Sequence, residues 1–205
     1  MLLDDTEFNA LNTFCKDFID QKCIVRNTIM PSKRPGEYYS WMFYLRRGLF
    51  NRDFLHSISI LFLDKVEKEI GHFDFQVSGL ETASTPMLAV LPLVAQMKGI
   101  NLHSFSIRKE RKEYGLLNWI EGIPNNKPVM LIDDLCNSSM SMKKAYDILL
   151  KEKLSPFPYA YAIVNKVNKK VHIEKRKNTD MYLPENIRML YQYDLDDFNL
   201  KNSSH

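Results

Sequence analysis

The sequence predicts an α/β fold in which a single-domain parallel sheet is flanked by helices and preceded by an N-terminal helical and aromatic element. The chain has 205 residues, which is about the length of one domain. From residue 73 onward, short apolar runs typical of strands alternate with helical patterns, and this alternation implies a parallel sheet with crossover connections. One run, Val129–Ile132, is continuously apolar, as in a strand that is buried on both faces.

The first seventy residues are predicted to form helices around an aromatic segment. Apolar residues recur at three- and four-residue steps from Phe8 to Phe18, which predicts a helix over about residues 4–21. Two prolines and a glycine between Met30 and Gly36 predict a loop. An aromatic stretch, 38–44, then precedes Arg46 and Arg47, and a second helix is predicted over about residues 53–70.

The remaining elements are predicted to form the sheet and its crossover helices. The strands are Phe73–Val77, Leu102–Ile107, Val129–Ile132, Tyr159–Val164 and a last one around Ile187–Tyr193, and the helices are Thr85–Lys98 and Met140–Lys153. Parallel sheets bind ligands at the carboxyl ends of their strands. A site is therefore expected in the loops that follow these strands, at residues 78–85, 108–126, 133–141 and from 165 onward.

Composition and charge exclude several classes of protein. With 45% hydrophobic residues and a net charge of +3, the chain is not predominantly disordered. No nucleic-acid partner is expected, because the basic run Lys166–Lys177 lacks interleaved aromatic residues and is interpreted as a solvated turn. No membrane partner is expected, because the longest nearly apolar run, Met87–Met97, is far shorter than the ~20 residues that span a bilayer. Acids at Asp4 and Asp5, and three cysteines without C-x-x-C spacing, predict a cytoplasmic protein.

Several familiar sites have no counterpart in the sequence. The seven glycines form neither G-x-G-x-x-G nor G-x-x-x-x-G-K, which argues against a Rossmann or P-loop nucleotide site. The five histidines show no metal-ligand spacing. Residues 141–144 match S-x-x-K, but the partner motifs of that class of serine hydrolase are missing.

The segment with the most informative chemistry is residues 129–141, V-M-L-I-D-D-L-C-N-S-S-M-S. A buried strand delivers Asp133 and Asp134 to the carboxyl edge of the sheet, and a loop of hydroxyl and amide residues leads into a helix. Such a loop can hold a phosphate, because the first turn of a helix presents unpaired N–H groups. An apolar strand ending in Asp-Asp is also typical of phosphate-hydrolysing P-loop proteins and receiver domains, and a structural helix cap is a third alternative. The missing glycine-lysine loop argues against the first, and the position late in the strand series argues against the second.

A second informative segment, R-K-E-R-K-E-Y-G at residues 108–115, directly follows a predicted strand. Its four basic residues form either a solvated loop or a loop that closes over a highly charged anion such as pyrophosphate.

Taken together, these segments resemble a known family. Residues 102–122 and the string I-D-D-L-C-N-S-S-M-S are similar to the type I phosphoribosyltransferases and, within them, to the orotate phosphoribosyltransferases. Residues 77–86 resemble the earlier pyrophosphate-contacting loop of that family, and the aromatic stretch before Arg46 and Arg47 resembles its base lid. The resemblance implies N-terminal helices and a base-lid element at residues 1–70, a phosphoribosyltransferase core at 71–165, and a C-terminal basic turn and final strand packed on the core at 166–205.

The resemblance also implies roles for individual residues. Asp133 and Asp134 would hold the ribose hydroxyls of phosphoribosyl pyrophosphate and stabilise positive charge that develops on the ribose. The other substrate-binding or catalytic positions are Asn137, Ser138, Ser139 and Ser141 for the 5-phosphate, Glu81, Thr82, Arg108, Lys109 and Lys112 for pyrophosphate, and Lys166 for the base. Met140, within the phosphate loop, is a further substrate-binding position. A magnesium ion would be held mostly by substrate and water, with Asp133 and Asp134 as the protein carboxylates beside it. One or more of the basic residues would come from a neighbouring subunit, since these enzymes are usually homodimers.

The chain departs from the family pattern at four positions. Ser139 replaces a glycine of the phosphate loop, and a side chain there costs about 1 kcal/mol or more if the backbone needs a positive φ. Tyr114 stands where many orotate enzymes have a histidine, and Ala83 near a position where many have a lysine. Lys166 falls near the arginine that contacts the orotate carboxylate, keeping the charge without the bidentate geometry.

The function expected from the resemblance is that of an enzyme of nucleotide metabolism. It would transfer ribose 5-phosphate from phosphoribosyl pyrophosphate to a nucleobase nitrogen and release pyrophosphate, and an orotate-like pyrimidine is the expected base. The alternative is a catalytically degenerate relative that acts as a ligand-sensing or protein-binding module, because the phosphate loop has lost its glycine.

Overall fold

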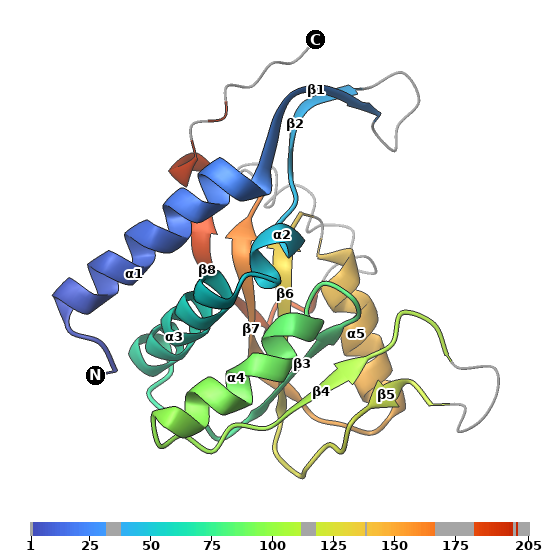
Figure 1. The fold of residues 1–205 in the computed structure, drawn as a ribbon. Helices are drawn as coiled ribbons and strands as arrows, with labels where there is room; N and C mark the ends of the chain where they lie inside the picture. The colour runs from blue at the N-terminus through green and yellow to red at the C-terminus, as the bar shows by residue number, and fades with distance from the viewer. Residues whose placement is uncertain are drawn as a thin grey trace.

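A parallel sheet forms the body of the protein, and the computed structural model describes it within residues 2–31, 38–111, 118–137, 139–166, 183–198 and 200. The strand order is β5-β4-β3-β6-β7-β8 (Figure 1). The strands are β3 (Gln76–Leu80), β4 (Ser104–Ile107), β5 (Ile120–Glu121), β6 (Val129–Cys136), β7 (Pro156–Asn165) and β8 (Arg188–Asp194). All neighbouring pairs are parallel except β4 and β5. The predicted α/β fold class is confirmed.

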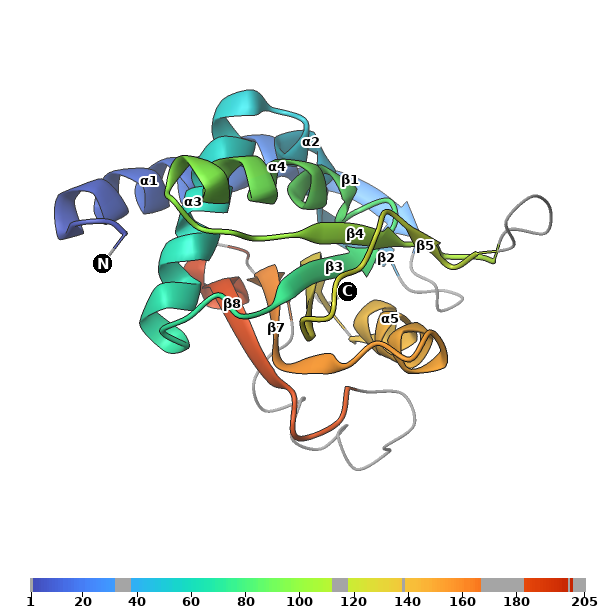
Figure 2. The same cartoon turned by 90° about the horizontal axis from the view of Figure 1, so that it is seen from below.

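Helices cover both faces of this sheet. The helices are α1 (Asp5–Phe18), α2 (Arg46–Leu49), α3 (Arg52–Glu69), α4 (Thr85–Met97) and α5 (Met140–Lys151). In Figure 2, α1, α3 and α4 lie on one side of the sheet and α5 lies on the other. Within the described ranges, no helix is long and apolar enough to cross a membrane.

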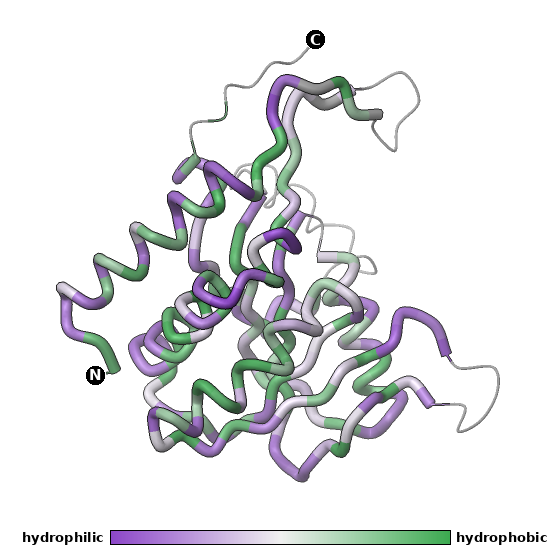
Figure 3. Tube along the Cα trace, in the orientation of Figure 1, coloured by the Kyte–Doolittle hydropathy of each residue, from purple (hydrophilic) through white to green (hydrophobic). Residues whose placement is uncertain are grey.

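The helix boundaries follow from local capping. The Asp4 side chain accepts a hydrogen bond from the Glu7 backbone N–H at 2.8 Å, and the Glu7 side chain accepts one from the Asp4 backbone N–H, which forms a capping box at the start of α1. Apolar and polar residues recur at the period of a helix along α1, and the apolar side packs against α3 (Figure 3). The helix continues into one π-helical turn, Ile19–Cys23, which fits the predicted end near residue 21. Asn51 caps α3 with its side-chain oxygen, which accepts hydrogen bonds from the backbone N–H groups of Asp53 and Phe54.

Each face of the sheet has its own hydrophobic core. Between the sheet and α3, Phe62 and Tyr161 are fully buried and pack edge to face with ring centroids 4.9 Å apart. Between the sheet and α5, Leu131 and Ile148 belong to the second core. Because β6 is buried on both faces, its apolar half fixes the position of the polar residues that follow.

The structure corrects the prediction for the segment before α2. A hairpin of β1 (Ile24–Pro31) and β2 (Tyr38–Phe43) projects from the body where only a loop and an aromatic stretch were predicted (Figure 1). Met30 and Pro31, predicted to begin the loop, pair with Tyr39 and Tyr38. A register shift between Arg26 and Met30, with Asn27 at a φ of 55°, interrupts the alternation that would have indicated a strand.

Several predicted boundaries also move. Strand β3 begins and ends three residues later than predicted, because Phe73 and Phe75 pack in the core before the ladder begins at Gln76. Helix α5 ends at Lys151 rather than Lys153, where Lys153 has a φ of 59°. Strand β6 continues through both acids to Cys136, because its ladder with β7 extends to the pair Cys136 and Asn165. The two-residue strand β5 was not predicted.

Candidate active site

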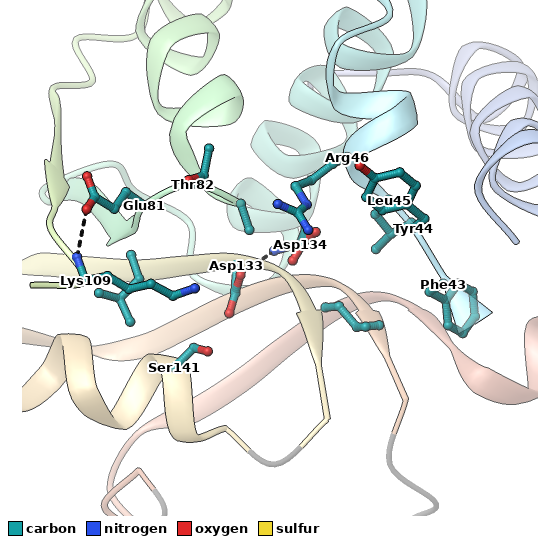
Figure 4. A pocket seen from close by; sticks show the side chains of 13 residues that line it. Phe43, Tyr44, Leu45, Arg46, Glu81, Thr82, Lys109, Asp133, Asp134 and Ser141 are labelled. Carbon is teal, nitrogen blue, oxygen red and sulfur yellow. Dashed lines mark hydrogen bonds between the residues drawn. The ribbon is translucent and has the colours of Figure 1, made fainter. Parts of the chain in front are cut away.

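A cavity of about 280 Å³ opens at the carboxyl end of the sheet (Figure 4). Six of the predicted site residues line it, and they come from the ends of three strands and the start of α5. These residues are Glu81 and Thr82 after β3, Lys109 after β4, Asp133 and Asp134 in β6, and Ser141 in α5. The expectation that loops distant in sequence meet at this edge is therefore confirmed for these positions.

The side chains of the two acids point in different directions from the second half of β6. Successive side chains of a strand point to opposite faces, and Figure 4 shows Asp133 directed toward Ser141 and Asp134 toward Arg46. The Asp134 backbone N–H donates to Asp133 Oδ1 at 2.9 Å, which holds the first carboxylate against the strand. Both residues are half-buried. The acids thus form the floor of the cavity rather than an exposed loop.

The pKa of each acid is raised. Burial raises the pKa of Asp133 well above its ordinary value, and the neighbouring Asp134 carboxylate raises it further, whereas the Lys109 ammonium opposes the shift. Burial also raises the pKa of Asp134, and the Arg46 guanidinium opposes that shift. Each acid therefore has a cation of its own across the cavity, and neither cation cancels the cost of burying the charge.

The wall that faces the acids comes from the N-terminal part of the chain. Phe43, Tyr44, Leu45 and Arg46 all line the cavity at the junction of β2 and α2. The Arg46 and Arg47 guanidinium carbons each lie 5.3 Å from the centre of the Tyr44 ring, within cation–π range. The sequence prediction likened this stretch to a base lid but did not include Arg46 among the site residues. The signal that could have found it is the pair of arginines directly after the aromatic run.

The loop after β3 is positioned by a hydrogen bond to the end of β4 and by the close packing of β3 against β6. Lys109 donates its backbone N–H to Glu81 Oε1 at 3.1 Å, which joins the ends of β3 and β4. Gly79 lies directly below this loop, where a Cβ would fall 2.3 Å from the Ile132 carbonyl oxygen. Only glycine permits this close approach of β3 and β6, so Gly79 sets how near Glu81 and Thr82 come to the acids.

The loop between β6 and α5 contains the residues predicted to hold the 5-phosphate. Ser139 has a φ of 57°, so the position does require the left-handed backbone for which glycine is preferred. Its side chain is buried, with Oγ 3.3 Å from Cys136 Sγ. Asn137 is exposed, and Met140 lies in a separate surface groove beside Trp119. Neither lines the cavity.

Two predicted basic residues lie outside the cavity lining. Arg108 forms an ion pair with Glu121 of β5, with Nη1 and Oε1 2.9 Å apart. Lys166 follows β7, and its Nζ lies 5.1 Å from the centre of a Trp41 ring in the hairpin. Lys112 and Ser138 fall outside the described residues, as does Tyr114. The roles of these residues remain predictions.

The donor set at the cavity suits a hard cation that is shared with a ligand. Within the described part of the chain, no group of three or more His, Cys, Asp or Glu side chains is arranged to hold a metal ion. Asp133 and Asp134 nevertheless place carboxylate oxygens on the cavity floor. Magnesium is commonly bound by one or two carboxylates together with substrate phosphates and water, so these residues fit such an ion.

Comparison with known proteins gives similarity in sequence and in fold. An orotate phosphoribosyltransferase of Bradyrhizobium diazoefficiens is 31% identical over 81 residues, which cover 37% of this chain and 43% of that protein. One of Methanocaldococcus jannaschii is 25% identical over 118 residues, covering 57% and 60%. The chain thus matches less than two thirds of either relative's length. No family model matches the chain.

The fold comparison covers almost the whole molecule. The crystal structure of a phosphoribosyltransferase from Corynebacterium diphtheriae superposes with a TM-score of 0.68 at 19% sequence identity, covering 93% of this chain and 99% of that one. The predicted resemblance is therefore confirmed: the chain has the fold of the type I phosphoribosyltransferases, and its sequence is similar to orotate phosphoribosyltransferases.

Proposed function

We propose that this protein is a phosphoribosyltransferase that uses phosphoribosyl pyrophosphate to attach ribose 5-phosphate to a nitrogen of an orotate-like pyrimidine. The observation that carries the proposal is the pairing of two half-buried acids with two cations around one cavity. Asp133 faces Lys109, and Asp134 faces Arg46, at the carboxyl edge of the sheet. The sequence similarity to orotate phosphoribosyltransferases supports the same assignment.

The arrangement suits a displacement at the ribose C1 carbon. The bond from C1 to the pyrophosphate oxygen breaks, a bond from C1 to the base nitrogen forms, and the proton on that nitrogen is lost to solvent. Positive charge develops on the ribose ring, and Asp133 and Asp134 stabilise it through their carboxylates. Lys109 and Arg46 neutralise the negative charge of the leaving pyrophosphate. The aromatic residues Phe43 and Tyr44 give the base an apolar wall.

Asp133 and Asp134 would also hold a magnesium ion shared with the substrate. When bound, the ion supplies positive charge to the pyrophosphate oxygens.

The test is pyrophosphate release over a panel of bases. The purified protein is mixed with phosphoribosyl pyrophosphate and magnesium, and release is followed with orotate, uracil and adenine in turn. Release with orotate alone supports the pyrimidine assignment, and release with adenine alone replaces it. The double variant D133N/D134N should lose turnover while remaining folded, and normal turnover by this variant would overturn the assignment.

Arg46 and Arg47 form a matched pair for testing the cavity wall. Both guanidinium groups lie 5.3 Å from the Tyr44 ring, but only Arg46 lines the cavity. We expect R46A to weaken the affinity for phosphoribosyl pyrophosphate about tenfold, as for loss of a charge-assisted hydrogen bond. R47A should leave it unchanged. Calorimetric titration measures both, and equal losses would show that Arg46 acts only through the Tyr44 ring.

A second candidate function is favoured by Ser139, whose side chain occupies the left-handed position in the phosphate loop. In this case the protein binds a ribose phosphate as a sensor and does not turn it over. Tight binding of phosphoribosyl pyrophosphate without pyrophosphate release over the panel of bases would favour this function.

Assembly and location complete the proposal. We propose a homodimer in the cytoplasm. The three cysteines are free and buried, which is consistent with a reducing compartment. Sedimentation equilibrium tests the dimer, and cell fractionation tests the location.

A further inference from the structure

The start of α5 is built on a backbone conformation that its sequence does not favour. Ser139 has a φ of 57° and a ψ of 5°, and its carbonyl accepts the hydrogen bond of the Lys143 N–H at 2.8 Å. This is the bond that opens the helix, so Ser139 sets the direction of the free N–H groups in the first turn. A non-glycine residue in this conformation persists only where its surroundings hold it.

Two neighbouring side chains supply such surroundings. The Ser139 hydroxyl is turned inward, 3.3 Å from Cys136 Sγ, and Ser139 makes no side-chain cap to its own helix. Tyr191 of β8 donates its hydroxyl hydrogen bond to the same Sγ at 3.7 Å. Cys136 is 2% exposed, and its backbone is fixed in the ladder between β6 and β7. The thiol therefore connects a fixed strand to the loop.

We propose that Cys136 is a positioning residue that holds the phosphate-binding loop in its left-handed turn through the Ser139 side chain, with Tyr191 supporting the thiol. This inference rests on the proposed function, because it concerns the loop expected to receive the 5-phosphate. These side-chain contacts hold the positive φ that a glycine would adopt without them. A glycine adopts a positive φ freely, whereas Ser139 needs its hydroxyl and Cβ accommodated beside the thiol.

The chemistry of the three groups fits this role. A thiol is a weak donor and a weak acceptor, so Cys136 can accept from Tyr191 and donate to Ser139 at the same time. The contacts are buried, where a hydrogen bond competes little with water. Loss of the thiol would leave the buried Ser139 hydroxyl without this partner. The left-handed turn would then relax, because relaxation lets water reach the hydroxyl.

The test is a double-mutant cycle between Cys136 and Ser139. Affinity for ribose 5-phosphate and for phosphoribosyl pyrophosphate is measured by calorimetry. We expect C136A to weaken binding about five- to tenfold, the size of one net hydrogen bond, and Y191F to weaken it about twofold. S139G is the reference background of the cycle, because a glycine adopts the positive φ without the contact to the thiol. In the S139G background, C136A should have no further effect.

The cycle separates positioning from general stability. A purely structural role of Cys136 in the core would give the same loss in both backgrounds, and this result would overturn the proposal. Unchanged binding by C136A alone would overturn it as well. C15A is the matched control, since Cys15 is also fully buried but lies in α1. This variant should lower the free energy of unfolding without changing the affinity for either ligand.

A second readout does not need a ligand. Exchange of the Lys143 amide hydrogen reports the bond to the Ser139 carbonyl, and C136A should accelerate it in the Ser139 background alone. If the wild type binds neither ribose 5-phosphate nor phosphoribosyl pyrophosphate, the proposed function fails. Amide exchange still decides whether Cys136 positions the loop through Ser139. Equal exchange rates in the wild type and the three variants of the cycle would refute this positioning role.

Discussion

The two acids on the cavity floor make one prediction that joins stability to function. Replacing Asp133 with asparagine removes a charge but keeps the oxygen that accepts from the Asp134 N–H at 2.9 Å. Because burial and the Asp134 charge raise the pKa of Asp133 in the folded state, its ionisation opposes folding. D133N should therefore be more stable than the wild type at neutral pH while losing turnover.

The size of this effect depends on pH in a definite way. Below the ordinary pKa of 3.8, Asp133 is protonated in both the folded and the unfolded protein, so D133N and the wild type should be equally stable. Between that value and the raised pKa, the advantage of D133N should grow by about 1.4 kcal/mol per pH unit and then level off. Each kcal/mol corresponds to about 2–4 °C in Tm for a domain of this size.

The assay is urea unfolding of both proteins at several pH values from 3 to 8. D53N is the control of opposite sign, because the hydrogen bond from Arg52 lowers the pKa of Asp53, so removing that carboxylate should not stabilise the protein. A stability difference between D133N and the wild type that stays constant over this pH range would refute the reasoning. So would a less stable D133N at pH 7.

Two further predictions concern the scaffold of the site. G79A should cost about 3 kcal/mol in urea unfolding and weaken phosphoribosyl pyrophosphate binding, because the added Cβ would lie 2.3 Å from the Ile132 carbonyl oxygen and force β3 away from β6. Unchanged stability would mean that the strands separate without cost. Y161F should be neutral or stabilise by up to about 1 kcal/mol, because the Tyr161 hydroxyl is buried without a hydrogen-bond partner among the described residues. Y193F should cost about 1 kcal/mol, because the Tyr193 hydroxyl donates to the Asn12 carbonyl at 3.0 Å. Thermal unfolding of the two variants side by side tests the contrast, and equal shifts would contradict it.

The sequence was sufficient for most of the strands and helices in their order along the chain, and for part of the site. Apolar runs that end in polar residues mark the carboxyl ends of parallel strands, so Asp133, Asp134 and Lys109 could be expected at one edge. Glu81 and Thr82 follow from the same rule. The topology brings these residues together, and the apolar strands that encode the topology are visible in the sequence.

The remaining parts of the site depend on contacts that periodicity does not encode. Arg46 enters the cavity from the N-terminal segment, whose placement against the sheet is a tertiary packing event. Arg108 forms an ion pair with Glu121, which lies thirteen residues further along on a strand too short to predict. The inward orientation of the Ser139 side chain depends on Cys136 and on Tyr191, and Tyr191 contacts Cys136 from another strand, β8.

The charge arrangement explains why one cavity suits a substrate with two opposite electrostatic demands. The acids are held at a cost, since burial raises the pKa of both and the cations Lys109 and Arg46 only partly oppose it. A ligand that brings a cation, or develops positive charge beside the acids, removes that cost at the moment the charge appears. Lys109 and Arg46 meanwhile remain available to an anionic group on the opposite side. In the proposed reaction, a ribose that becomes positive while pyrophosphate departs would make both demands at once, so the cavity would be complementary to the transition state rather than to either charge alone.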